Sequence, residues 1–375
     1  MGILWRVLLL TLLFGNCAVT AAGVCHWPAW DKYQRDYIST EGRVIDPSTP
    51  SQITTSEGQS YGLFFALVAN DRAMFEKMLQ WTEDNLASGD LSAHLPAWQW
   101  GKKVPQAEDS PWDILDPNSA SDADLWIAYN LLEAGRLWQS RRFLTLGTLL
   151  LQRIAREEVA EIPGLGVMLL PGKVGFVHGD RWRLNPSYLP PQLLTRFSTL
   201  NGPWKAMRAV NLSLLKESAP KGFSPDWVVW NKQQGWQADE TKPNIGSYDA
   251  IRVYLWAAML AEESEERAAL VTHFQPMATL TTQSGTPPEQ VDTATGKAQG
   301  TGSVGFSAAL LPLLAANSAA RDVQRQRLHD APPDSNAYFS ASLTLFGQGW
   351  DEQRYRFNQQ GELLPVWDKQ CATSP

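Results

Sequence analysis

Apolar residues recur at helical spacing in many separate segments of this 375-residue chain, and runs that alternate apolar and polar residues are scarce. This periodicity predicts a mainly helical protein, with Pro and Gly between the helices. The clearest predicted helices cover residues 60–69, 73–86, 122–138, 141–159, 204–216, 248–262, 303–316 and 336–346.

No Pro/Ser-rich linker and no change in composition divides the chain after its first two dozen residues, so residues 23–375 are predicted to form a single domain. A domain of this length exceeds the usual size of one hydrophobic core. A closed ring of divergent helical hairpins permits such growth. The predicted fold class is therefore all-α, with two long Trp-containing polar loops, residues 94–120 and 163–190, of the kind that usually carry function.

The N-terminus has the pattern of a signal peptide. Arg6 precedes the apolar run from Val7 to Phe14, which is too short to span a bilayer, and Ala18, Ala21 and Ala22 are candidates for cleavage. Residues 1–22 are predicted to be removed, which places the mature protein in the periplasm or outside the cell without stable membrane insertion. A lipid anchor on Cys17 is the alternative, but Asn16 stands where a lipobox requires a small residue.

Removal of the leader leaves two cysteines, Cys25 and Cys371, near the two ends of the mature chain. Disulfides form in exported proteins, so we expect these two residues to be joined. Two free thiols far apart are the alternative, because a sequence does not show how far apart the Cα atoms are.

A net charge of -7 argues against a nucleic acid as partner, since phosphate backbones are bound through clustered Lys and Arg. The chain has 17 Trp. Flat aromatic faces stack on sugar rings, so this number suits a neutral sugar polymer. Packing in the core is the alternative for many of these residues.

Two short motifs fail the test of their context. The segment from Gly58 to Gly62 fits G-x-S-x-G, the motif of serine esterases, but no alternation of strands and helices surrounds it. The segment from Gly300 to Gly305 fits a dinucleotide-binding motif, but it follows polar residues and not a hydrophobic strand. The five histidines lack metal-ligand spacing. No metal or cofactor is predicted.

Three acids lie at the predicted starts of helices. Glu57 is surrounded by small residues, where partial desolvation would give it the raised pKa that a general acid requires. Asp122 follows Ser121, which is predicted to cap its helix in a capping box with Asp124. Asp249 lies three residues before Arg252, and an ion pair between them would keep the carboxylate ionised. Each acid also has a structural alternative as a partner of the helix dipole.

These segments resemble glycoside hydrolase family 8, and within it the endoglucanases that accompany bacterial cellulose synthases. The likeness rests on Thr55-Ser56-Glu57-Gly58-Gln59-Ser60-Tyr61-Gly62, on Ala120-Ser121-Asp122-Ala123-Asp124 and on Ser247-Tyr248-Asp249-Ala250-Ile251-Arg252. The chain departs from the family pattern at Asn130, where Ser or Ala is expected. The similarity extends from His26 to Trp350, nearly all of the mature chain.

The resemblance implies an (α/α)6 barrel and hydrolysis of a β-1,4-glucan chain with inversion, with Glu57 as acid, Asp249 as base and Asp122 holding the sugar. The cellulose synthase complex is an expected partner. A non-catalytic glucan-binding subunit and an enzyme acting on xylan or chitosan are the alternatives. Aromatic residues in the long loops and at the helix starts, together with Arg252, are predicted to bind substrate: Trp98, Trp100, Trp112, Trp182, Tyr188 and Tyr248.

Overall fold

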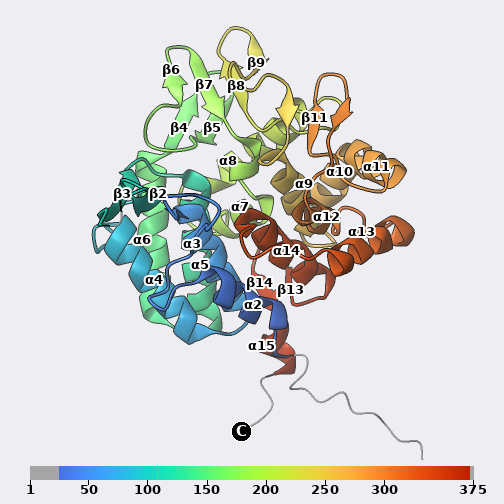
Figure 1. Ribbon diagram of the computed structural model, residues 1–375. Helices are drawn as coiled ribbons and strands as arrows, with labels where there is room; N and C mark the ends of the chain where they lie inside the picture. Colours follow the sequence, from blue (N-terminus) through green and yellow to red (C-terminus); the bar gives the residue numbers. More distant parts are fainter. Residues whose placement is uncertain (1–24, 108, 372–375) are drawn as a thin grey trace, which may run out of the picture.

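The computed structural model describes residues 25–107 and 109–371, in which helices predominate (Figure 1). The predicted signal peptide, residues 1–22, lies outside the described residues. The longer helices are α2 (Pro28–Tyr37), α3 (Ser56–Val68), α4 (Arg72–Leu86), α5 (Ser121–Leu137), α6 (Arg141–Glu157), α7 (Pro191–Phe197), α8 (Trp204–Glu217), α9 (Ala250–Met259), α10 (Glu265–His273), α11 (Gln275–Ser284), α12 (Val304–Leu310), α13 (Ser318–Asp330) and α14 (Tyr338–Asp351). The short elements η1 (Pro186–Tyr188) and α15 (Val366–Gln370) complete the helices of the described part.

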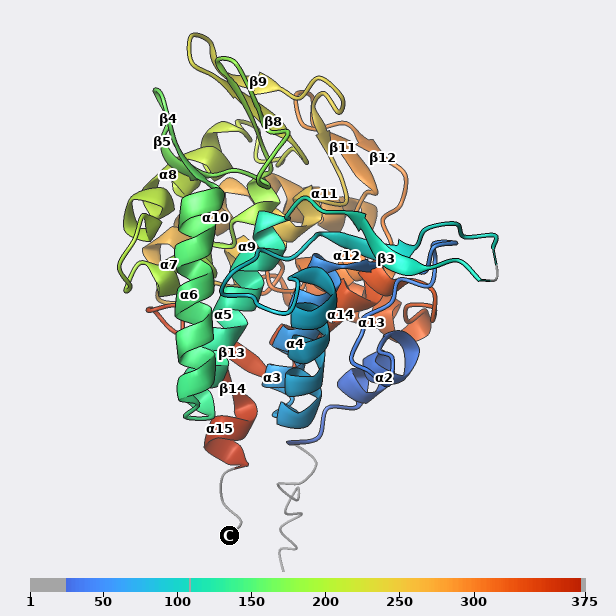
Figure 2. The ribbon, with the colours of Figure 1, turned by 90° about the vertical axis from the view of Figure 1, so that its left-hand side faces the viewer.

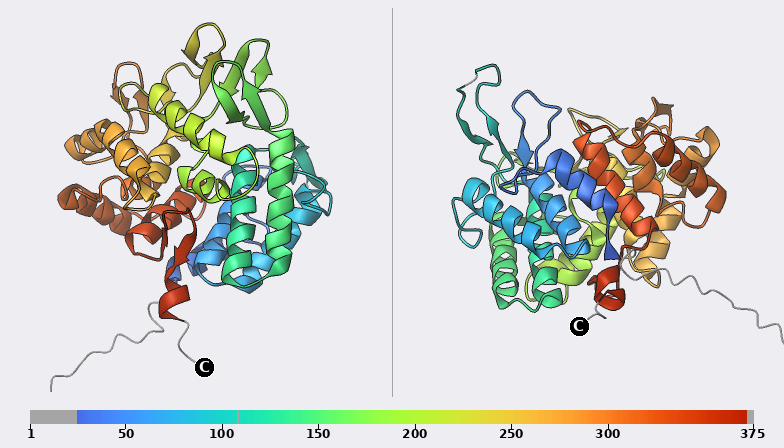
Figure 3. Two further views of the ribbon diagram at one scale, coloured as in Figure 1. Left: turned by 180° about the vertical axis from the view of Figure 1, so that it is seen from behind. Right: turned by 60° about the horizontal axis from the view of Figure 1, so that its bottom comes forward.

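The helices alternate between an inner and an outer ring. In the inner ring α3 contacts α5, followed in turn by α7, α9, α12 and α14. Phe346 of α14 closes the ring against Phe64 and Phe65 of α3, with ring centroids 5.1 and 4.7 Å apart. The outer helices α2, α4, α6, α8, α10 and α13 pack against this ring. The view from behind in Figure 3 shows α6 and α8 on the outside of the barrel, toward the viewer. The fold is an (α/α)6 barrel, which confirms the predicted fold class.

Each predicted helix is present, although the bounds differ. The inner helices are buried on all sides: every residue of α9 is buried, and so is α5 from Ser121 to Gly135. The apolar stripe that predicted each of these helices is therefore only one part of a helix surface that is buried on every face. Close packing also restricts residue size. A Cβ atom on Gly347 would lie 1.9 Å from the carbonyl oxygen of Ala308, so α14 can approach α12 this closely only with glycine at that position.

The two segments predicted as loops contain short antiparallel strands, which corrects the sequence interpretation. Strands of two to five residues are too short to show a clear alternating pattern. Figures 1 and 2 show most of them at one end of the barrel. The sheets are β1 (Thr54–Thr55), β2 (Gln99–Lys102) and β3 (Trp112–Asp116); β4 (Val159–Ile162) and β5 (Gly166–Leu169); β6 (Val177–His178), β7 (Arg181–Leu184), β8 (Val228–Asn231) and β9 (Gly235–Ala238); β10 (Ile245–Gly246), β11 (Gln290–Asp292) and β12 (Ala298–Gln299); and β13 (Tyr355–Phe357) with β14 (Leu363–Pro365).

The two ends of the described chain lie together at the opposite end of the barrel, near α15 (Figure 1). Cys25 and Cys371 form a disulfide there, with Cα atoms 5.9 Å apart and a sequence separation of 346. The bridge fastens the first described residue to the last turn of the chain. Within the described ranges, the structure contains no helix that is both long and apolar enough to cross a membrane.

Candidate active site

The three predicted acids meet around one guanidinium group. Glu57, Asp122 and Asp249 each follow a short strand and lie in the first turn, or at the N-cap, of α3, α5 and α9. Arg252, one turn into α9, is 3% exposed and forms an ion pair with Glu57 through Nη1. Its Nη1 is also 3.5 Å from Oδ2 of Asp122, and its Nη2 donates to Oδ1 of Asp249 at 2.6 Å. Residues almost 200 positions apart in sequence therefore share one buried cation.

Local contacts hold Glu57 at the start of α3. The hydroxyl of Thr55 caps the helix by accepting a hydrogen bond from the backbone N–H of Gly58 at 3.0 Å. Burial raises the pKa of Glu57, and although the ion pair with Arg252 opposes this shift, the negative charge of Asp249 adds to it. The side chain keeps 23% of its surface exposed. Glu57 thus combines a raised pKa with access from outside, the two properties that a proton donor needs.

Asp122 lies deeper than Glu57. Its side chain is 4% exposed, and its Oδ1 accepts no hydrogen bond from the part of the chain that the structure describes. Burial raises its pKa to about 7, against the opposing charge of Arg252. An unpaired buried carboxylate oxygen is costly, so this atom is suited to receive a hydroxyl group of a ligand.

The predicted capping box at the start of α5 is wrong. Ser121 is the first residue of the helix, the N-cap is Ala120, and no side chain caps this end. Asp124 is fully buried, and the neighbouring acid Glu158 adds to the effect of burial in raising the pKa of Asp124. The side chain of Asp124 therefore turns toward the interior and not back along its own backbone.

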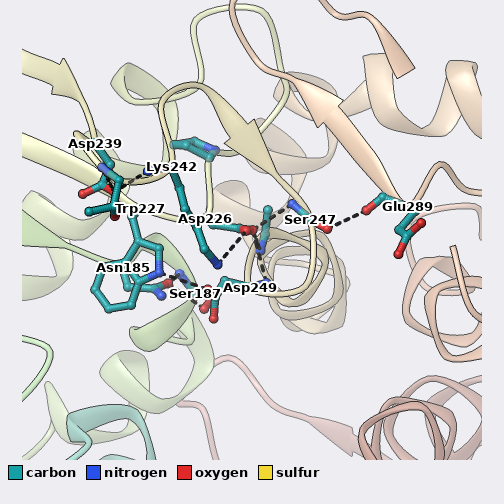
Figure 4. A network of polar contacts seen from close by, with 12 residues as sticks. Asn185, Ser187, Asp226, Trp227, Asp239, Lys242, Ser247, Asp249 and Glu289 are labelled. Carbon is teal, nitrogen blue, oxygen red and sulfur yellow. Dashed lines mark hydrogen bonds and ion pairs between the residues drawn. The ribbon is translucent and has the colours of Figure 1, made fainter. Parts of the chain in front are cut away.

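Two residues that the sequence analysis did not single out surround Asp249. Trp227 donates its indole N–H to Oδ2 of Asp249 at 3.1 Å, and Asp226 accepts a hydrogen bond from the backbone N–H of Asp249 at 3.2 Å (Figure 4). The guanidinium of Arg183 lies 3.8 Å from the centroid of the Trp227 ring and is held by Asp239. Asp226 and Trp227 lie within the stretch from His26 to Trp350 over which the chain resembles the family, and that likeness was the one signal available for them.

Two of the predicted aromatic residues, Tyr188 and Trp98, lie near the acids and are half-buried. The ring of Tyr188 lies 5.8 Å from that of Trp227 and 5.9 Å from the guanidinium carbon of Arg252. The carbonyl of Trp98 accepts a hydrogen bond from the backbone N–H of Ser56, next to Glu57. Both residues therefore lie close to the acid cluster.

The other predicted aromatic residues are distributed differently. Trp100 and Trp112 stack with centroids 5.3 Å apart, and the guanidinium of Arg43 lies 4.6 Å from each ring. Trp112 is 39% exposed and Tyr248 is 48% exposed. Trp182, in contrast, is 8% exposed and belongs to the main hydrophobic core, so packing explains its position.

The chemistry of this site is that of acids and bases. Among the described residues, no group of three or more His, Cys, Asp or Glu side chains could hold a metal ion. The helical barrel brings a carboxyl group with a raised pKa and an ion-paired carboxylate to one site, beside exposed aromatic rings. Cleavage of an acetal requires two such acids. These features define a glycoside hydrolase.

Comparison with known proteins gives the family. The model of glycosyl hydrolases family 8 matches residues 1–353, and the chain belongs to that family. A protein of Escherichia coli O157:H7 named endoglucanase is 57% identical over the whole of both chains. One of Xanthomonas axonopodis pv. citri with the same name is 50% identical, covering 95% of this chain and 93% of its own.

A solved structure supports the same conclusion. The crystal structure of an endo-1,4-D-glucanase from Vibrio fischeri ES114 is similar with a TM-score of 0.87 and 47% identity, covering 91% of this chain and 99% of its own. The likeness therefore includes almost the whole described barrel.

Proposed function

We propose that this glycoside hydrolase is an endo-β-1,4-glucanase that cleaves a cellulose-like glucan with inversion of the anomeric carbon. The observation that carries the proposal is the ion-paired cluster of Glu57, Asp122 and Asp249 around Arg252. Relatives at 50–57% identity are named endoglucanases, which supports glucan as the substrate class.

In the proposed reaction Glu57 gives its proton to the glycosidic oxygen as the bond to the anomeric carbon breaks. Asp249 takes a proton from a water molecule, whose oxygen attacks the same carbon from the opposite face. The new hydroxyl group therefore has the α configuration. Arg252 holds the carboxyl groups of Glu57 and Asp249 through ion pairs, and Trp227 supplies a second hydrogen bond to Asp249.

Asp122 is proposed to hold the sugar at the point of cleavage. An inverting reaction forms no covalent intermediate and so needs no nucleophile from the protein. The unpaired Oδ1 of Asp122 can instead accept a hydrogen bond from a sugar hydroxyl. Loss of this contact would lower the rate through poorer positioning, because correct orientation supplies a large part of the catalytic effect.

The proposed sugar platforms are Trp98, Trp100, Trp112, Tyr188 and Tyr248. Each of these five rings is half-buried or exposed. Trp100 and Trp112 lie in β2 and β3, Trp98 just before β2, Tyr188 in η1 and Tyr248 just before α9. Trp182 is left out of this group because its ring is part of the core.

The acid and base assignments are tested by Glu57→Gln and Asp249→Asn. General acids and bases contribute about 10²–10⁴-fold, so each variant is expected to fold and to lose at least that factor in glucanase turnover. Glu265→Gln is the matched control, since Glu265 is an exposed acid in the first turn of α10. Turnover near that of the unchanged protein in either site variant would refute the assignment.

Substrate range separates the remaining alternatives. A non-catalytic glucan-binding subunit would bind soluble cellulose derivatives without shortening them. A family member specialised for xylan or chitosan would release products from those polymers faster than from cellulose derivatives. We expect shortening of soluble cellulose derivatives to be the fastest of the three reactions, measured as reducing ends released per enzyme molecule.

We further propose that residues 1–22 are removed on export and that the enzyme works in the periplasm alongside cellulose synthesis. The disulfide between Cys25 and Cys371 supports export, because such bonds persist in oxidising compartments. N-terminal sequencing of protein recovered from a periplasmic extract should begin near Gly23. A start at Met1 would contradict the proposal.

A further inference from the structure

Asp226 is a buried acid that makes its contacts with the backbone of α9. It lies two residues before β8, its backbone N–H donates to the carbonyl of Ile245 in β10, and it is 1% exposed as a residue. Its Oδ1 accepts hydrogen bonds from the backbone N–H groups of Ser247 at 2.7 Å, Asp249 at 3.2 Å and Ala250 at 2.9 Å (Figure 4). One oxygen atom thus binds the N–H groups of the N-cap residue and the first helical residue, which have no partners within the helix, and that of Ser247 just before them.

This arrangement differs from the usual capping of a helix. An Asp at an N-cap ordinarily turns its own carboxylate back to accept a backbone N–H of the first turn. Asp249 is the N-cap residue of α9, yet its side chain makes no such bond. Its two oxygens face Arg252 and Trp227 instead. Asp226, 23 residues earlier in the chain, does the capping in its place.

We propose that Asp226 is a positioning residue for Asp249. By satisfying the backbone of the first turn of α9, it leaves the Asp249 carboxylate free to point toward the substrate cleft and fixes the backbone from which that side chain extends. This inference rests on the proposed function of Asp249 as the base. Lys242 lies 3.9 Å from the second oxygen of Asp226 and offsets part of the negative charge that two neighbouring acids bring together.

The first test separates positioning from simple stabilisation. Asp226→Ala removes the acceptor, so Asp249 is expected to turn back toward its own helix. We expect kcat to fall about 10- to 100-fold, as small misplacements of catalytic groups do, with KM within about twofold. Asp226→Asn keeps an oxygen at the same place and should recover most of kcat.

Asp71→Ala is the matched control. Asp71 caps α4 and accepts three hydrogen bonds, from Met74 N, Trp30 Nε1 and Gln34 Nε2, at 3.1 to 3.2 Å. Its loss should lower the melting temperature without changing kcat. If Asp226→Ala likewise lowered only the melting temperature, Asp226 would be a structural cap and the proposal would be wrong. Should that variant fail to fold, Asp226→Glu, which moves the acceptor by one methylene, must show the loss of kcat.

Azide distinguishes failure of this inference from failure of the proposed function. Azide attacks as an anion and has no proton to lose, so it replaces water where the base is missing. Asp249→Ala should regain turnover with azide and form an α-glycosyl azide, whereas Asp226→Ala, which keeps the base, should not. Rescue of Asp226→Ala and not of Asp249→Ala would make Asp226 the base and overturn both proposals. Rescue of Asp249→Ala with unchanged kcat in Asp226→Ala would overturn the inference alone.

Discussion

Replacing Arg252 by methionine removes the cation that the three acids share and keeps a side chain of similar length. In the structure its guanidinium reaches Glu57, Asp122 and Asp249, and also donates to the hydroxyl of Tyr61 at 3.1 Å. The acids are 4% to 23% exposed, so water can replace few of these contacts.

The expected loss of stability follows from burial. Removing one partner of a buried ion pair costs about 3–5 kcal/mol because the remaining charge is left uncompensated. Without Arg252 the acids resist ionisation. A carboxyl group whose pKa is raised in the folded state makes the folded protein less stable as pH increases through that pKa. The difference in unfolding free energy between Arg252→Met and the unchanged protein should therefore grow from about pH 4.5 to pH 8.

Urea unfolding followed by tryptophan fluorescence measures this difference at both pH values. Arg72→Met is the control, since Arg72 binds Glu76 through a hydrogen bond of 2.9 Å and both side chains are exposed, at 51% and 43%. Exposed ion pairs contribute at most about 1 kcal/mol. A loss below about 1 kcal/mol for Arg252→Met, or one equal at the two pH values, would refute the view that this cation stabilises three ionisable acids.

Other perturbations have equally definite outcomes. Trp112→Ala should raise KM for long oligosaccharides by a factor that corresponds to about 1–3 kcal/mol of binding free energy, by analogy with aromatic stacking on bases. Cleavage of short oligosaccharides should be unchanged. The double variant Cys25→Ser, Cys371→Ser should have a lower melting temperature and retain activity at moderate temperature. Its loss in free energy of unfolding should be at most about 5 kcal/mol. Burial raises the pKa of Glu158 to about 8 despite its hydrogen bond from Ser119. The folded protein therefore loses stability as pH rises toward 8. Between pH 5 and pH 9 the melting temperature of Glu158→Gln should fall less than that of the unchanged protein.

Much of the fold could be predicted because the evidence for it is local. The inner helices α3, α5 and α9 carry dense apolar periodicity, and the acids lie at their starts, where small polar residues precede them. The length of the chain without a linker made a ring of hairpins one suitable arrangement, and the resemblance to family 8 implied the (α/α)6 barrel. Helices α2, α7, α10, α11 and α13 were not among those predicted. In α13 the buried residues are just Ala320, Gln324 and Leu328, which leaves a weak pattern in a polar segment.

The rest of the site depends on contacts between distant segments. Asp226 caps a helix that begins 24 residues later, and no spacing rule connects it with Ala250. The contact between Arg252 and Glu57 joins positions 195 residues apart. Trp182 was predicted to face the cleft because it lies in a long segment, but pairing of β7 with β8 places its ring in the core. Such placements are decided by tertiary packing, which a single sequence does not display.

The stereochemistry of the first product tests the central proposal most directly. Proton NMR of a fresh digest of a soluble β-1,4-gluco-oligosaccharide shows the anomeric signals before mutarotation mixes them. Water activated by Asp249, on the face opposite Glu57, must yield the α-anomer first, with the β-anomer appearing only as the solution equilibrates. Initial appearance of the β-anomer would mean retention, and Asp249 could not be the base of an inverting reaction.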